Sequence, residues 1–146
     1  MYNTEERHCN IPFDDLITSQ KDKDHTRVIF QNVNSLDLSS GHHTLALMCD
    51  SIAHYVVDIA YLAETNTNWK HNYATVLFKA TTKRHWRHSH STTSETAIDW
   101  SDIYQPGGTT IITLPPFSFG ITTSGSDPHG LSRCSYITII SAYRVC

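Results

Sequence analysis

The sequence lacks an excess of basic residues, a long apolar run and a signal peptide. Its 11 Lys and Arg against 14 Asp and Glu give a formal net charge of -3. This balance excludes nucleic-acid binding by bulk positive charge, because that mode neutralises many phosphates at once. No stretch has the length of apolar sequence that spans a bilayer, and the polar first 24 residues contain no signal-peptide core. We therefore expect no membrane role.

Closely spaced cysteines are also missing. Cys9, Cys49, Cys134 and Cys146 are scattered along the chain. They form neither a CxxC pair nor the dense framework of a small secreted disulfide-rich domain. We expect reduced cysteines and an intracellular protein.

What is present fits a single domain with one core. The chain has 146 residues, of which 39% are hydrophobic and 17% charged, a composition typical of a globular protein. Residues 1–24 are polar, with little periodicity, and are interpreted as a flexible leader. The ordered domain is expected to span residues 25–146.

The first part of that domain predicts a strand, a helix and a second strand. Residues 27–33 are rich in β-branched and aromatic side chains, and residues 57–62 form a second such run. Between them, apolar residues recur every three or four positions, which predicts one buried helical face. The residues of this face are Leu45, Met48, Cys49, Ile52, Ala53 and Val56.

The later part predicts another helix and several short strands. A weaker helical pattern contains Tyr73, Val76, Leu77 and Ala80. Strands are expected over 88–96, 109–114, 118–124 and 135–145, separated by Gly and Pro turns. Together these elements indicate an α/β fold with mixed β-sheets flanked by helices.

Two polar residues stand at the ends of the first two predicted strands. Because ligands bind beyond the carboxyl ends of strands in α/β sheets, Asn32 and Glu64 are candidates for one shared site. An amide oxygen and a carboxylate suit a hard cation such as Mg²⁺. The alternative is that Asn32 and Asn34 only form a turn and that Glu64 is merely exposed.

The motifs around these residues resemble those of the endonuclease/exonuclease/phosphatase superfamily. Gln-Asn-Val-Asn-Ser-Leu over 31–36 and Leu-Ala-Glu-Thr-Asn over 62–66 are similar to its first two signatures. The resemblance implies that Asn32 and Glu64 bind the catalytic metal, Mg²⁺ or Mn²⁺. It covers the chain from residue 27 to residue 146.

Further matches extend the resemblance. They are Pro-Gly-Gly-Thr over 106–109, Ser-Gly-Ser-Asp-Pro over 124–128, and Ile-Ser-Ala-Tyr-Arg over 140–144. The last makes Tyr143 the candidate contact to the scissile phosphate, and hence a catalytic residue. Asn34, Arg133 and Arg144 are candidate nucleic-acid contacts. The sequences of these segments are similar to those of apurinic-endonuclease-like and non-LTR retroelement endonuclease-like members. A retroelement origin makes the nucleus a candidate location.

The departures from the superfamily pattern predict an incomplete domain. The later Gly-Asp-x-Asn and Ser-Asp-His motifs have no counterpart before Cys146. The expected fold is therefore part of a four-layered α/β sandwich with the C-terminal half missing. Without an Asp-assisted His no positioned base is evident, so we expect loose Mg²⁺ binding and little or no activity from this chain alone.

Other functions remain open at this point. The chain could be a non-catalytic remnant or interaction module of the same fold, associated with a chain that supplies the missing half. It could also be a phosphatase-type hydrolase that uses the same metal site. If the function involves nucleic acid, DNA is expected rather than RNA.

A second constellation lies at residues 85–90, where three histidines alternate with Trp86 and Arg87. Zinc is not expected, because the spacing does not match known zinc sites and no paired Cys is present. Trp86 could stack on a nucleic-acid base beside Lys83, Arg84 and Arg87. The alternative is a solvated helix end whose Trp86 packs on the sheet.

Overall fold

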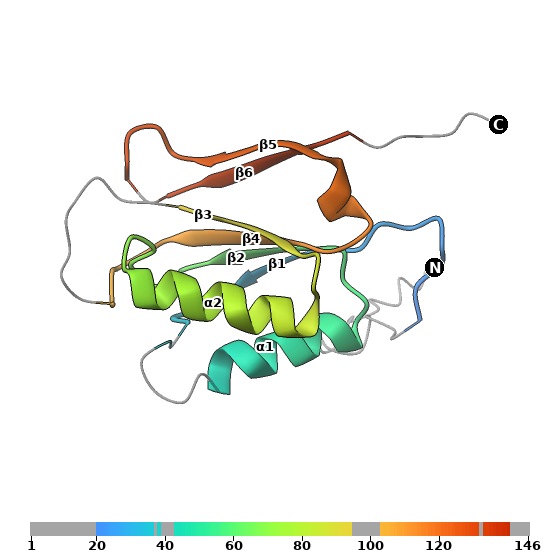
Figure 1. Ribbon diagram of the computed structural model, residues 1–146, viewed down its shortest axis with the longest axis horizontal. Helices are drawn as coiled ribbons and strands as arrows, with labels where there is room; N and C mark the ends of the chain where they lie inside the picture. Colours follow the sequence, from blue (N-terminus) through green and yellow to red (C-terminus); the bar gives the residue numbers. More distant parts are fainter. Residues whose placement is uncertain (1–19, 37, 39–42, 95–102, 132, 141–146) are drawn as a thin grey trace, which may run out of the picture.

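The computed structural model describes residues 20–36, 38, 43–94, 103–131 and 133–140. Two α-helices, six strands and a short 3₁₀ helix (η2) follow one another in these segments (Figure 1). Their order is β1 (Val28–Asn32), α1 (His43–His54), β2 (Ile59–Ala63), α2 (Asn72–His85), β3 (His90–Thr93), β4 (Thr109–Thr113), η2 (Phe117–Gly120), β5 (Ile121–Ser126) and β6 (Ser135–Ile139).

The strands form two sheets. The larger sheet has the order β1-β2-β4-β3, and β5 pairs with β6 in a separate two-stranded sheet. β1 runs parallel to β2, while the β2–β4 and β3–β4 pairs are antiparallel. Both helices cover one face of the larger sheet and the β5–β6 pair lies on the other (Figure 1). This arrangement confirms the predicted α/β class with mixed sheets.

Helix α1 buries most of the face expected from the sequence. Leu45, Met48, Cys49 and Ile52 are buried in the core. Ala53, however, is exposed, and so is Val56, which lies beyond the end of the helix with a φ of 51°. The prediction for these two residues was wrong: Val56 lies beyond the end of the helix at His54, and Ala53 lies in the last turn but outside the buried face.

Helix α2 buries a different face from the predicted one. Its buried residues are Ala74, Phe78, Thr81 and Thr82, whereas Tyr73 and Val76 are 48% and 58% exposed and Ala80 is also exposed. The ring of Phe78 packs edge-on against Trp69 at 5.0 Å between centroids, so the larger apolar side chain sets the rotation of the helix. Thr82 can be buried because its hydroxyl donates to Phe78 O within the helix.

The later strands are shorter than predicted or shifted. The strand expected over 88–96 spans His90–Thr93, and the strand expected over 118–124 is preceded by η2 and spans Ile121–Ser126. The last strand covers Ser135–Ile139, and residues 141–145 of the predicted strand lie outside the described residues.

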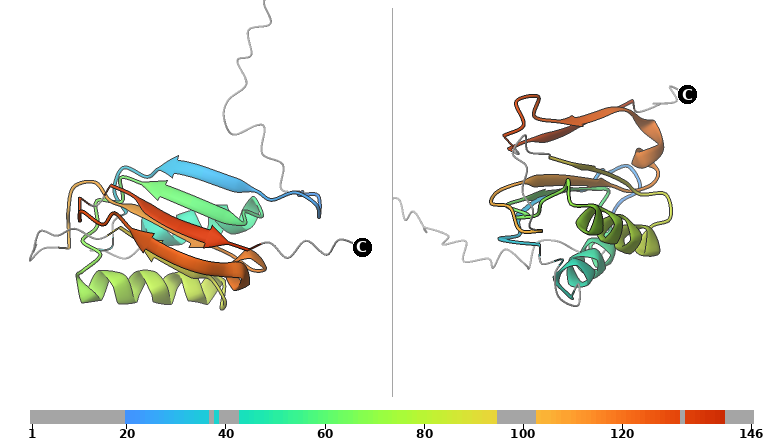
Figure 2. Two further views of the ribbon diagram at one scale, coloured as in Figure 1. Left: turned by 90° about the horizontal axis from the view of Figure 1, so that it is seen from above. Right: turned by 60° about the vertical axis from the view of Figure 1, so that its left-hand side comes forward.

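The two faces of the larger sheet are covered unequally. All five residues of β4 are buried, because helices lie on one side and the β5–β6 pair on the other. In β2 only Ala60 and Leu62 are buried, and Val28 and Phe30 of β1 are 60% and 68% exposed. Seen from above, the β5–β6 pair covers β3 and β4 and leaves β1 and β2 open (Figure 2).

The segment before β1 is attached to the start of β2. Lys21 Nζ lies 2.6 Å from both carboxylate oxygens of Asp58, and Arg27 N donates to the same carboxylate at 2.7 Å. Asp58 is 5% exposed, so these donors satisfy a buried charge. Residues 1–19 of the expected leader lie outside the described residues. No helix among the described residues is long and apolar enough to cross a membrane.

Candidate metal site at the strand ends

Asn32 and Glu64 stand at the carboxyl ends of neighbouring parallel strands. Asn32 lies opposite Ala63 in the pairing of β1 with β2, and Glu64 follows Ala63 directly. The contact continues past the strands, since Val33 N donates to Ala63 O at 3.0 Å and Ser35 N donates to Glu64 O at 2.8 Å. The backbones that carry the two predicted metal ligands are therefore hydrogen-bonded neighbours.

Unusual backbone conformations concentrate at this end of the sheet. Asn34, Ser35, Glu64 and Asn66 have φ angles of 44°, 93°, 52° and 50°. Residues other than Gly rarely adopt this left-handed region, and such residues are enriched where a fold holds a functional geometry. The strand alternation breaks here, so each loop leaves its strand in a sharp turn.

The loop after β2 is held from several sides. Thr65 is fully buried, and its hydroxyl accepts a hydrogen bond from Trp69 Nε1 at 3.2 Å. Thr65 N donates to Gly108 O, while Thr65 O accepts from Leu36 N. Trp69 is 4% exposed and packs in the core. The loop that carries Glu64 is thus held by hydrogen bonds to three separate segments.

The donor atoms fit a hard cation. Asn32 shares a sheet face with Phe30, because successive side chains alternate, and its Oδ1 accepts Asn34 N at 2.9 Å. A carbonyl oxygen has a second lone pair for another partner. Glu64 is exposed and can present its carboxylate to solvent. One carboxylate and one amide oxygen suit Mg²⁺, which keeps several waters when few protein ligands bind it.

The candidate site does not contain a larger cluster of typical metal-binding side chains among the described residues. Within the described ranges, no three His, Cys, Asp or Glu side chains come together as a group able to hold a metal ion. Asn32 and Glu64 together supply only one residue of those four types. Their assignment as metal ligands stays a prediction.

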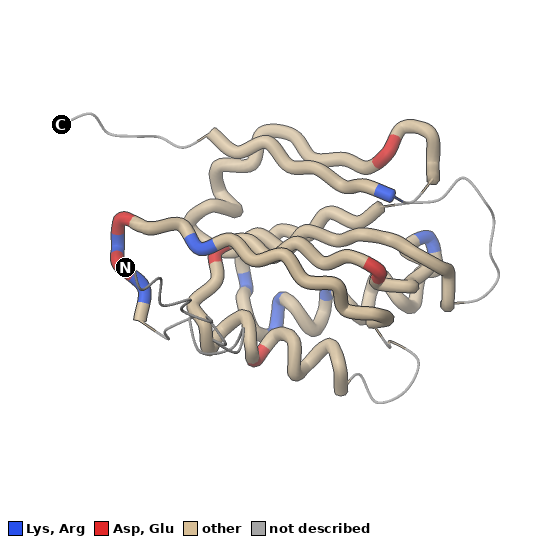
Figure 3. Tube along the Cα trace, turned by 180° about the vertical axis from the view of Figure 1, so that it is seen from behind, with Lys and Arg blue, Asp and Glu red and all other residues tan. Residues whose placement is uncertain are grey.

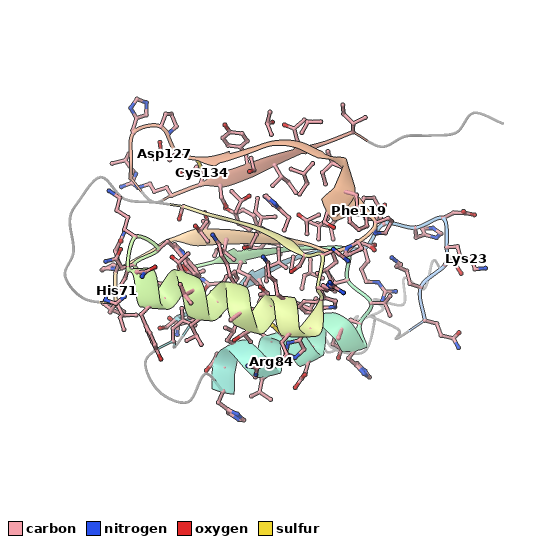
Figure 4. All side chains as sticks on the ribbon, in the orientation of Figure 1. Lys23, His71, Arg84, Phe119, Asp127 and Cys134 are labelled. Carbon is pink, nitrogen blue, oxygen red and sulfur yellow. The ribbon has the colours of Figure 1, made fainter. Side chains whose placement is uncertain are left out.

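Arg133 lies at the same end of the molecule as the candidate site. Thr109 is the pairing partner of Ala63, and its Oγ1 lies 3.0 Å from Ser135 Oγ at the start of β6. Arg133 is exposed and precedes Ser135 by two residues. In Figure 4, Asp127 and Cys134 lie at the same end as His71, which precedes α2, whereas Phe119 and Lys23 lie at the other end.

The remaining predicted site residues have different outcomes. Asn34 is exposed in the turn after β1, where its N–H contacts Asn32. Tyr143 and Arg144 lie outside the described residues, so the structure does not place them. Lys and Arg residues of the described segments are spread over several elements and do not gather at the strand ends (Figure 3).

Two histidines lie close to aspartates, but away from the candidate site. In the described segments, His25 lies 3.5 Å from Asp22 before β1, and His85 lies 3.3 Å from Asp50 between the two helices. Neither pair is at the carboxyl ends of β1 and β2. The strand ends therefore offer oxygen ligands without an Asp-assisted His from the described residues.

The constellation at residues 85–90 forms a helix end. Trp86 is partly buried and packs against the core, as the packing alternative predicted. His85 contacts Thr81 O at 3.0 Å as well as Asp50, and the ring of His88 lies 5.6 Å from that of Phe119. These contacts tie the end of α2 to its neighbours.

Sequence reasoning missed Asn66 as part of the site. Asn66 Oδ1 accepts a hydrogen bond from Gly107 N at 2.8 Å, and Asn66 N donates to Gly107 O at 2.7 Å. The available signals were an Asn two residues after Glu64 and a Gly-Gly turn before a strand. Nothing in the local pattern says that these segments, 41 residues apart, meet.

Comparison with known proteins finds a similar fold among solved structures. No protein-family model matches the sequence, and no curated protein matches it either. Among solved structures, an endonuclease/exonuclease/phosphatase family protein from Leptotrichia buccalis C-1013-b superposes with a TM-score of 0.51 at 18% identity. The match covers 79% of this chain and 50% of that chain. The chain thus has a fold similar to half of an endonuclease/exonuclease/phosphatase family protein.

Proposed function

We propose that this chain is part of a metal-dependent phosphodiester hydrolase of the endonuclease type, with Asn32 and Glu64 as its metal ligands. The observation that carries the proposal is the meeting of these two residues at the ends of adjacent parallel strands. The structural neighbour named above supports the superfamily through its fold. The signatures around both residues point to the same superfamily.

The residues of the site would divide the work as follows. Glu64 supplies the negative charge that attracts a divalent cation, and Asn32 supplies a neutral oxygen beside it. A bound Mg²⁺ would neutralise charge that develops on a phosphate during hydrolysis. Arg133, from the connection before β6, would contact a neighbouring phosphate of the substrate. Tyr143 and Arg144 are proposed to contact the substrate from the segment after β6.

We propose that the chain alone binds the metal loosely and does not hydrolyse its substrate. Hydrolysis also needs a base that activates water and groups that hold the water in line with the leaving oxygen. The strand ends supply neither from the described residues. DNA is the proposed substrate class, because the motifs resemble those of apurinic endonucleases. RNA is less favoured.

A plasmid assay tests the proposed inactivity, and a Mg²⁺ titration tests the proposed metal site. Supercoiled DNA incubated with the purified chain and Mg²⁺ is expected to stay supercoiled, while a Mg²⁺ titration followed by NMR shifts the amides near Glu64. Magnesium-dependent nicking that Glu64→Ala abolishes would disprove the inactivity but support the metal site. Amide shifts that are unchanged in Glu64→Ala would refute the metal site itself.

A second candidate function is an interaction module of the same fold, and the open face of β1 and β2 favours it. Phe30 stacks on Tyr61 at 5.1 Å between ring centroids, yet Phe30 is 68% exposed and Val28 is 60% exposed. Among the described strands, β1 is also an edge strand without a charged residue, and the outer backbone of such a strand can pair with a strand of another chain. A chain that supplies the rest of the sandwich is the proposed partner.

Substitution of Phe30 tests this candidate. Phe30→Ser removes exposed apolar area and one aromatic stack, so its cost in unfolding free energy should not exceed about 1.5 kcal/mol. If the face docks a partner, the variant should lose self-association or partner capture in sedimentation experiments. Val76→Ser, which removes an exposed apolar side chain from α2, is the matched control. Equal behaviour of both variants would rule out the face as a docking surface.

A further inference from the structure

Asn66 joins the loop that carries Glu64 to the turn before β4. Its backbone N–H donates to Gly107 O at 2.7 Å, and its side-chain Oδ1 accepts from Gly107 N at 2.8 Å. Its carbonyl accepts a third hydrogen bond, from Gln105 N at 3.1 Å. One residue thus satisfies both backbone groups of Gly107 and one of Gln105.

The turn is shaped to receive this residue. Gly107 and Gly108 have φ angles of 83° and 92°, a region that side chains disfavour. A Cβ on Gly107 would meet no atom within 4 Å, so the need for glycine comes from the backbone angle and not from lack of space. Gly108 O also accepts Thr65 N at 3.2 Å, which extends the contact by one residue toward Glu64.

The identity of residue 66 meets two requirements at once. Its φ of 50° lies in the left-handed region, which Asn and Asp tolerate better than other residues with side chains. Its side chain also has to place an acceptor where Gly107 N points. Gly would satisfy only the first requirement, and Ala would satisfy neither.

Glu64 lies between two such attachments. On one side, its carbonyl accepts Ser35 N at 2.8 Å, which links it to the loop after β1. On the other side, Asn66 links it to the Gly107 turn. We propose that Asn66 is the positioning residue of the candidate metal site, which holds the backbone of Glu64 so that its carboxylate stays beside Asn32. This inference rests on the proposed function, because it needs Glu64 to bind the cation.

Three substitutions separate the two properties of Asn66. Asn66→Gly keeps the left-handed backbone but removes the acceptor for Gly107 N. Asn66→Ala removes the acceptor and also disfavours the backbone angle. Asn66→Asp keeps both the angle and the acceptor. Asn72→Ala, at an exposed position of the first turn of α2, serves as the control variant.

Two measurements are made on each folded variant. The Mg²⁺ dissociation constant comes from amide shifts near Glu64. Loosening of the strand ends comes from hydrogen exchange at Ser35 N and Leu36 N, which donate to Glu64 O and Thr65 O. Asn66→Gly is expected to weaken Mg²⁺ binding by about tenfold or more, as for other groups that orient a metal ligand. Asn66→Ala should weaken it further.

Hydrogen exchange distinguishes positioning from direct binding. The exchange at both amides should accelerate in Asn66→Gly and return to the parent rate in Asn66→Asp, while Asn72→Ala matches the parent in both measurements. Weaker Mg²⁺ binding without faster exchange would mean that Asn66 contacts the ion itself, and it would overturn the inference.

Failure of the inference can be told from failure of the proposed function. If Glu64→Gln loses Mg²⁺ affinity and Asn66→Gly does not, Glu64 binds the ion without help from Asn66. If the parent and Glu64→Gln give the same titration, there is no site at Glu64, and both the proposed function and the role of Asn66 are refuted.

Discussion

Asn32 and Glu64 are brought together by the parallel pairing of β1 with β2, although 31 residues separate them in the chain. Asn32 faces Ala63 across the pair, and the carbonyl of Glu64 accepts Ser35 N. The two side chains that the motifs single out therefore start from hydrogen-bonded backbone segments. This relationship is the structural basis of the proposed metal site.

The orientation of α2 gives a stability prediction. Phe78 is 1% exposed, whereas Val76, which the apolar pattern placed in the core, is 58% exposed. Phe78→Ala should lower the free energy of unfolding by about 3–5 kcal/mol, because it leaves a cavity beside Trp69. Val76→Ala should stay within about 0.5 kcal/mol of the parent. Urea denaturation followed by circular dichroism measures both, and equal losses would contradict this orientation of the helix.

The attachment of residue 21 gives a second prediction. Lys21→Ala leaves the Asp58 carboxylate buried, with Arg27 N as a remaining donor. We expect a loss of roughly 2–3 kcal/mol of unfolding free energy. This loss is at or below the low end of the range for a broken buried ion pair, because Arg27 N still donates to the carboxylate. Lys23→Ala, at an exposed position two residues away, should change stability very little. If both lysine variants unfold at the same urea concentration, the Lys21–Asp58 contact does not stabilise the fold.

The two described cysteines should differ in reactivity. Burial, with a further contribution from the charge of Asp50, raises the pKa of Cys49 to about 12, whereas Cys134 is exposed. At pH 8 the thiolate fraction of Cys49 is therefore more than about a thousandfold below that of an ordinary thiol. In a background with Cys9→Ser and Cys146→Ser, an aromatic disulfide reagent should titrate one thiol rapidly and the second only after denaturant is added.

The background with both serines also supplies the control for that experiment. Adding Cys134→Ser should abolish the rapid phase and leave the slow one. Rapid reaction of both thiols in the folded protein would show that the core around Cys49 is open.

The sequence predicted the parts of the fold that depend on strong local patterns. The runs over 27–33 and 57–62 are continuous and β-branched, and both became paired strands. The face of α1 was predicted up to Ile52 because its leucine and methionine spacing is regular. Local pattern and tertiary packing agree in these elements.

The errors occur where packing overrides a weak pattern. In α2 the threonines at 81 and 82 are buried, with the hydroxyl of Thr82 bonded to Phe78 O. A pattern based on apolar residues cannot anticipate buried hydroxyls. The strand predicted over 118–124 overlaps η2, because the chain makes a 3₁₀ turn through Gly120 before β5 begins at Ile121.

The candidate site was only partly predictable for a related reason. Asn32 and Glu64 stand in recognisable motifs, so their pairing could be expected before the fold was known. Asn66 acts through Gly107, and no local rule links residues of separate loops. Contacts of this kind depend on how β2 and β4 pair, which the sequence does not specify by itself.

A paramagnetic titration tests the metal site most directly. Mn²⁺ added to the labelled protein broadens the amide signals nearest to the bound ion. A site between Asn32 and Glu64 predicts that Asn34 and Thr65 broaden first, while His88 and Leu114 stay sharp, and that Glu64→Gln removes the effect. Broadening that begins elsewhere, or that persists unchanged in Glu64→Gln, would contradict a metal site at the ends of β1 and β2.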